Sequence, residues 1–234
     1  MTNRSHAARR TPHDMTHHPD AVILLHGLTR TARSMNGMAR ALAAHGFAVV
    51  NQGYPSRHKP IEALAPLAIE QALAACRKGR PARIHFVTHS LGGILVRQYL
   101  AQSRIPELGR VVMLGPPNQG SEVVDRFSVL PGFAQLNGPA GLQLGTGPDS
   151  IPNRLGPVDY PVGVIAGTRS VNPILSTAFA GRNDGKVSVQ RARVDGMADF
   201  IEVATSHPFM MRNRTVVRQT IEFLRHGRFG RGWR

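Results

Sequence analysis

The stretch Ile84-His85-Phe86-Val87-Thr88-His89-Ser90-Leu91-Gly92-Gly93-Ile94-Leu95-Val96 is an apolar run typical of a strand, followed by a serine and a run typical of a helix. A serine at such a sharp turn is held in a strained backbone conformation that exposes its hydroxyl, and small neighbours avoid clashes. The helix that starts at Leu91 offers unpaired N–H groups beside it. This context predicts Ser90 as a nucleophile; the alternative is that Ser90 only caps the helix.

The same alternation of strand and helix runs through most of the chain. Runs rich in β-branched or aromatic residues predict six strands, at 22–25, 48–50, 84–88, 111–114, 162–166 and 200–204. Helical segments are expected near 32–45, 61–78, 91–103 and 212–225. The pattern predicts an α/β fold with a mostly parallel sheet of about six strands and helices on both faces.

The length of 234 residues suits one sizeable domain, expected over residues 21–227. A disordered basic arm is expected at 1–20 and a basic tail at 228–234. Residues 116–160 contain seven prolines among apolar positions and cannot form a strand. This insertion is expected to be either a lid over the substrate or an irregular excursion packed on the core.

The formal net charge of +15 arises from 26 arginines and three lysines against 14 acids. The arginines are scattered and no nucleic-acid-binding motif accompanies them, so we expect an arginine-rich solvated surface and no nucleic-acid partner. Weak contact with an anionic membrane surface stays open. The single cysteine, Cys76, is expected to pack in a helix and excludes an internal disulfide. No apolar run of membrane-spanning length and no secretory signal occur, which makes the cytoplasm the expected location.

The segment Thr88-His89-Ser90-Leu91-Gly92-Gly93 resembles the G-x-S-x-G elbow of α/β-hydrolase lipases and esterases, with Thr88 in place of the first glycine. Upstream, His26-Gly27-Leu28 at the end of the first strand is similar to the H-G-L loop of these lipases. The resemblance implies an oxyanion hole formed by the amides of Leu28 and Leu91. His26 is then expected to be a structural residue that forms hydrogen bonds.

In the fold that this resemblance implies, the triad follows the chain order serine, acid, histidine. Only His207 and His226 follow Ser90 in the sequence, and His226 lies in an arginine-rich tail that nothing obvious anchors. His207 lies in a loop expected between the last strand and the terminal helix, where catalytic histidines of this family occur. We therefore expect His207 to be the general base.

Most acids between Ser90 and His207 fall in the insertion or beside strands, which leaves Asp184 and Asp195 as candidates. The segment Asp184-Gly185-Lys186-Val187 resembles the D-G-x-V segment that follows the penultimate core strand in many lipases. A plain Asp-Gly turn is the alternative interpretation. Asp184 is the expected acid, which would fix the tautomer of the histidine, and Asp195 is the second choice.

These resemblances imply a serine hydrolase that cleaves small-molecule or lipid esters through an acyl-enzyme, with neither a metal nor an organic cofactor. Pro117-Asn118-Gln119-Gly120-Ser121 is similar to a stretch in deacylase-like members of the family. The same triad could cleave a thioester or an amide, since fold alone does not fix the substrate. The alternative is a non-catalytic relative that binds lipids or anions.

Overall fold

The computed structural model describes residues 19–171, 179 and 181–232. The arm expected at 1–20 therefore lies almost entirely outside the described residues, as do the last two residues of the tail. Within the described ranges, no helix has the length and apolar character needed to cross a membrane.

The centre of the structure is one parallel sheet with the strand order β2-β1-β3-β4-β5-β6. Its strands are β1 (Ala21–Leu25), β2 (Ala48–Gln52), β3 (Ile84–His89), β4 (Leu108–Leu114), β5 (Val162–Gly167) and β6 (Asp199–Val203). Strands β1, β3 and β5 are buried along their whole length, as expected where helices cover both faces. The predicted fold class is confirmed, and each strand lies where its apolar run indicated.

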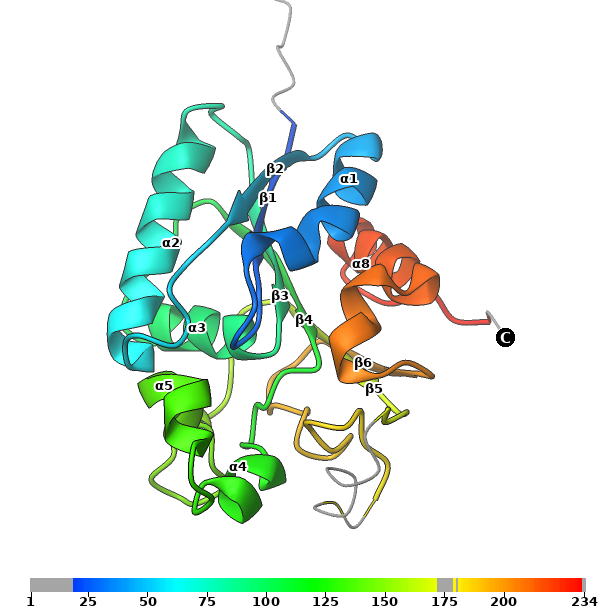
Figure 1. Cartoon of the computed structure of the whole chain (residues 1–234). Helices are drawn as coiled ribbons and strands as arrows, with labels where there is room; N and C mark the ends of the chain where they lie inside the picture. Colours follow the sequence, from blue (N-terminus) through cyan, green and yellow to red (C-terminus); the bar gives the residue numbers. More distant parts are fainter. Residues whose placement is uncertain (1–18, 172–178, 180, 233–234) are drawn as a thin grey trace, which may run out of the picture.

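Two helical layers cover the sheet (Figure 1). Helices α2 (Ile61–Arg77) and α3 (Leu91–Leu100) pack on one face, while α1 (Asn36–Ala44) and α8 (Arg214–His226) pack on the other. Because successive side chains of a strand point to opposite faces, Ile23 and Leu25 of β1 join the first core, and Val22 and Leu24 join the second. Cys76 is buried in α2, consistent with a packing role.

The terminal helix α8 has clear start and stop signals. The side chain of Asn213 accepts hydrogen bonds from the amides of Thr215 and Val216, and Gly227 ends the helix at a φ of 74°.

The segment expected as one helix at 32–45 is divided into a short 3-10 helix, η1 (Ala32–Met35), and α1.

The insertion between β4 and β5 contains three short helices and no strand. These are α4 (Glu122–Phe127), α5 (Phe133–Leu142) and α6 (Ile151–Arg154). Figure 1 shows α4 and α5 beyond the carboxyl ends of the central strands. The buried guanidinium of Arg97 in α3 donates to the carbonyls of Asn118, Pro152 and Gly156 at 2.7–3.1 Å. The two ends of the insertion are therefore fastened to the core.

The expectation of an unanchored C-terminal tail is wrong for the described residues 228–232. Phe229 is buried against Phe223, and its amide donates to Asp199 Oδ2 at 2.8 Å. Gly230 exchanges two hydrogen bonds with the side chain of Gln219. An aromatic residue among the arginines docks this segment, because burying its ring removes a large apolar area from water.

Candidate active site

Ser90 lies at the turn from β3 into α3, with φ 52° and ψ −121°. A positive φ is unusual for a residue with a side chain, and such strain persists only where the surrounding structure imposes it. Gly92 allows the turn to sit close to β1, since a Cβ there would lie 2.7 Å from the carbonyl oxygen of Leu25. The strained conformation presents Ser90 at the carboxyl edge of the sheet.

Thr88, which stands where related elbows have a glycine, is accommodated without displacing the turn. It is fully buried, and its hydroxyl points toward the carbonyl oxygen of Val112 in β4, 3.5 Å away. A Cβ at Gly93 would come within 3.3 Å of this hydroxyl. The small residue at 93 therefore leaves room for the larger one at 88.

His207 and Asp184, 23 positions apart in the sequence, form a buried pair. His207 Nδ1 lies 2.7 Å from Asp184 Oδ2, and the amide of His207 donates to the carbonyl of Asp184 at 2.9 Å. The Asp184 side chain is 1% exposed and that of His207 is 10% exposed. With Nδ1 directed at the carboxylate, Nε2 of His207 is left for another partner.

His207 was expected in a loop, but it opens the short 3-10 helix η2 (His207–Arg212). The physical reason is Pro208, whose fixed φ suits the first turn of a helix and whose missing N–H would have no partner there. The start of η2 fixes the backbone of His207.

The loop around Asp184 holds its carboxylate in place. Asp184 Oδ1 accepts hydrogen bonds from the amides of Lys186 and Val187, both at 2.9 Å. Gly115, with φ 54°, follows β4 and leaves room for the pair, because a Cβ there would lie 2.8 Å from Asp184 Oδ2. Both carboxylate oxygens are thereby engaged, and one of them is directed at the histidine.

The two competing candidates lie elsewhere. Asp195 is exposed, and its carbonyl accepts a hydrogen bond from Val158. His226 ends α8 and lies 3.8 Å from Glu222 of the same helix. Neither residue contacts the pair of His207 and Asp184.

A second histidine, which the sequence did not single out, contacts His207. His89 is buried, its Nε2 lies 3.0 Å from the carbonyl oxygen of His207, and the two rings are 4.7 Å apart. Burial lowers the pKa of His89 well below its usual value, and the neighbouring His207 lowers it further. His89 is therefore a neutral imidazole that can donate to the backbone of His207. Its position directly before Ser90 is the feature of the sequence that could have indicated a role in the site.

His26 forms the hydrogen bonds expected of a structural residue. Its ring stacks on Tyr54 at 4.1 Å, its Nδ1 lies 2.9 Å from the carbonyl oxygen of Gly27, and its Nε2 accepts from the amide of Tyr54. The Tyr54 hydroxyl donates to the carbonyl of His26. Burial lowers the pKa of His26. These contacts fix the loop that leads to Leu28.

Ser90, His207 and Asp184 line one cavity of about 280 Å³. Leu28 lines it as well, while Leu91 is buried as the first residue of α3. Much of the remaining wall is apolar and comes from the insertion, namely Pro117, Val123, Val124, Phe133 and Leu144. Within the described part of the chain, no three His, Cys, Asp or Glu side chains gather as metal ligands.

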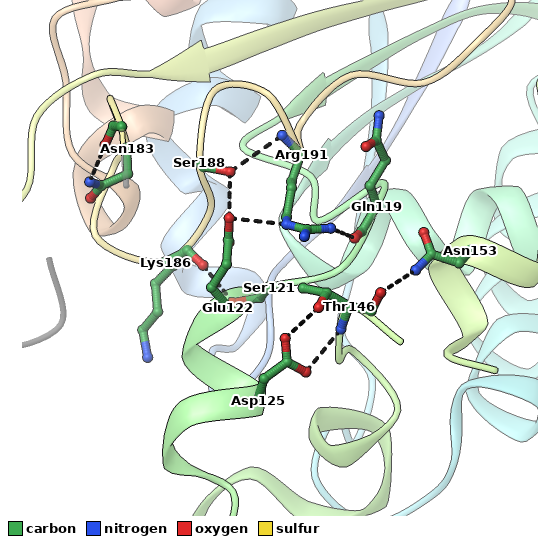
Figure 2. Close-up of polar contacts among 11 residues, drawn as sticks. Gln119, Ser121, Glu122, Asp125, Thr146, Asn153, Asn183, Lys186, Ser188 and Arg191 are labelled. Carbon is green, nitrogen blue, oxygen red and sulfur yellow. Dashed lines mark hydrogen bonds and ion pairs between the residues drawn. The ribbon is translucent and has the colours of Figure 1, made fainter. Parts of the chain in front are cut away.

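Polar contacts tie the insertion to the loop that carries Asp184 (Figure 2). The hydroxyl of Ser121 donates to the carbonyl of Lys186 at 2.6 Å. Glu122, at the start of α4, accepts from Ser188 at 2.8 Å and pairs with Arg191 at 3.0 Å. These contacts were not predicted, because each joins two segments about 65 or more positions apart. They join the loop that carries Asp184 to the wall of the cavity that the insertion forms.

The alpha/beta hydrolase family matches residues 22–221 of this sequence, which is most of the chain. The chain therefore belongs to the alpha/beta hydrolase family. No curated protein matches it significantly in sequence.

Several solved structures have the same fold. The mature lipase BlEst2 of Bacillus licheniformis is 18% identical with a TM-score of 0.69, over 92% of this chain and 95% of that one. The phospholipase PlaB of Legionella pneumophila, in complex with thio-NAD, is 18% identical with a TM-score of 0.69, over 88% of this chain and 58% of that one. The metagenomic carboxyl esterase MGS0156 is 18% identical with a TM-score of 0.60, over 82% of this chain and 65% of that one. At these identities the likeness concerns the fold, which is similar to that of lipases and esterases.

Proposed function

We propose that this protein is a serine hydrolase that cleaves carboxylic esters through an acyl-enzyme. The observation that carries the proposal is the buried pair of His207 and Asp184, which shares one cavity with the strained Ser90. Family membership and the fold shared with lipases and esterases support the same class of reaction.

In the proposed reaction, His207 takes the hydroxyl proton of Ser90 through Nε2, and the serine oxygen attacks the ester carbonyl carbon. Asp184 holds Nδ1 and stabilises the imidazolium that forms. The amides of Leu28 and Leu91 stabilise the oxyanion of the tetrahedral intermediate. His207 then protonates the leaving alcohol, and a water activated by the same histidine releases the acid.

A fluorophosphonate probe and p-nitrophenyl esters of increasing acyl length test this proposal. We expect the parent protein to be labelled and to hydrolyse the esters, and Ser90→Ala to lose both properties. Ser103→Ala is the control, because this serine follows α3 outside the cavity and should leave labelling and hydrolysis intact.

Hydrolysis by Ser90→Ala at the parent rate would contradict the assignment of the nucleophile. A folded parent protein that is neither labelled nor active would instead favour the non-catalytic binding protein that the sequence left as an alternative.

A further inference from the structure

Two cations line the cavity that contains Ser90. Arg30 lies two residues after Leu28, and Lys186 lies two residues after Asp184, so they reach the cavity from the two loops that flank it. Both residues are exposed to solvent. No ion pair found in the described part of the chain includes either side chain.

The backbone beneath Lys186 is fixed on both sides. Its amide donates to Asp184 Oδ1 and its carbonyl accepts from Ser121. Figure 2 shows the side chain extending away from the carboxylate of Glu122, which is already engaged by Ser188 and Arg191. The side chain of Lys186 therefore starts from a fixed backbone at the cavity and does not pair with the carboxylate of Glu122.

Anions are scarce in the cavity wall. Among its described lining residues, Asp184 is the sole carboxylate, and both of its oxygens are occupied by His207 and by two amides. Although the residue as a whole is exposed, partial desolvation of its ammonium group lowers the pKa of Lys186, Asp184 raises it, and Arg30 lowers it. The last effect means that the two cations repel each other, and an anion bound between them would relieve this repulsion.

We propose that Arg30 and Lys186 select ester substrates that carry an anionic group, such as a carboxylate, on a short apolar chain. The apolar part of the wall, which includes Val123, Val124 and Phe133, accommodates the chain, and the two cations face its charged end. The net charge of +15 favours the approach of such anions from solution. This inference rests on the proposed esterase function and narrows its substrate class.

The test compares matched pairs of esters by their ratio of kcat/KM. One pair is mono-p-nitrophenyl adipate against p-nitrophenyl hexanoate, with the charge on the acyl side. The other is 4-acetoxybenzoate against methyl 4-acetoxybenzoate, with the charge on the leaving group. We expect the charged member of at least one pair to be preferred, and the preference to fall as ionic strength rises.

Substitutions assign the preference to the two cations. Arg30→Gln and Lys186→Gln should each lower the charged-to-neutral ratio roughly two- to fivefold, the range expected for an exposed ion pair. Arg30→Lys and Lys186→Arg, which keep the charge, should retain most of the ratio. Lys78→Gln at the end of α2 is the remote control, since Lys78 is exposed and does not line the cavity.

The outcomes separate the two proposals. Hydrolysis of neutral esters that depends on Ser90, without preference for either charged ester, would overturn the anion selectivity and leave the esterase function standing. A preference that survives the double substitution of Arg30 and Lys186 by Gln would also overturn it. A protein inactive on all four esters and unlabelled at Ser90 would overturn both proposals.

Discussion

His89 Nε2 lies 3.0 Å from the carbonyl oxygen of His207, so the residue before the proposed nucleophile contacts the backbone of the proposed base. The ring of His89 is buried, and burial keeps its pKa well below the usual 6.5. A proton there would have no water to solvate it and would lie beside His207. We infer that His89 is a neutral donor that positions the proposed base.

This relationship predicts a loss of stability in acid. Because the folded pKa of His89 is depressed, the unfolded chain binds a proton as pH falls below about 6.5 while the folded protein does not. The free energy of unfolding should therefore fall between pH 7 and pH 5, by up to about 1.4 kcal/mol per pH unit for each such histidine. His26, whose pKa is also lowered by burial, adds to the effect. Urea unfolding at a series of pH values measures it.

His89→Gln provides the control for the acid prediction, since the amide keeps an N–H donor and does not titrate in this range. The variant should show a shallower dependence of unfolding free energy on pH than the parent. An equal slope in both proteins would show that His89 is not the group responsible.

Asp184→Asn should lower kcat by about 10³–10⁴-fold, because an amide at this position no longer holds the histidine tautomer and the imidazolium. Steady-state hydrolysis of a p-nitrophenyl ester measures the effect. Asp195→Asn is the matched control, because this exposed acid was the second candidate and lies outside the cavity. Near-parent activity of Asp184→Asn, or a large loss in Asp195→Asn, would move the acid role elsewhere.

Gly115→Ala should impair both stability and activity. Its φ of 54° is unfavourable for alanine, and the added Cβ would lie 2.8 Å from Asp184 Oδ2 and from Met210 Sδ. We expect a loss of about 1–3 kcal/mol in unfolding free energy, together with a fall in kcat as the carboxylate is displaced. Denaturant unfolding and ester hydrolysis measure the two effects separately.

Gly132→Ala is a control matched in backbone conformation. Gly132 has a φ of 85°, and a Cβ there would meet nothing within 4 Å. This variant should therefore show the backbone strain without the collision, and it should keep the parent kcat. Equal kcat losses in the two alanine variants would argue against a specific contact at Gly115.

The sequence predicted the order of strands and helices because burial on both faces demands continuous apolar runs. It also predicted the acid and histidine that the structure brings together, through the turn at Asp184-Gly185 and the position of His207 after the last strand. Contacts between distant segments lacked a local signal. The interactions of Glu122 with Ser188 and Arg191, and the docking of Phe229, depend on three-dimensional proximity that no periodicity encodes. The burial of Arg97 and its hydrogen bonds to the insertion were not predicted, because arginine is rarely buried.

Arg97→Lys should destabilise the protein by about 2–4 kcal/mol. A lysine keeps a positive charge but cannot serve the three backbone carbonyls at once, because it lacks the planar fork of the guanidinium. Thermal unfolding measures the loss, and faster proteolysis within 116–160 should accompany it. Arg104→Lys, on an exposed arginine near the end of α3, is the control. An unchanged melting temperature in Arg97→Lys would refute the anchoring role.

The fastening of both ends of the insertion by one guanidinium also bears on how the cavity beside Ser90 could be redesigned. The backbone at 118 and at 152–156 is fixed, so the depth of the pocket depends on side chains between these points, such as Phe133 and Leu144. If the proposed esterase function holds, replacing the ring of Phe133 and the branched chain of Leu144 with smaller groups should lengthen the acyl chains that fit. The strands, the turn at Ser90 and the loop that carries Asp184 should keep their places. The size of the cavity could then be changed by substitutions in the insertion alone.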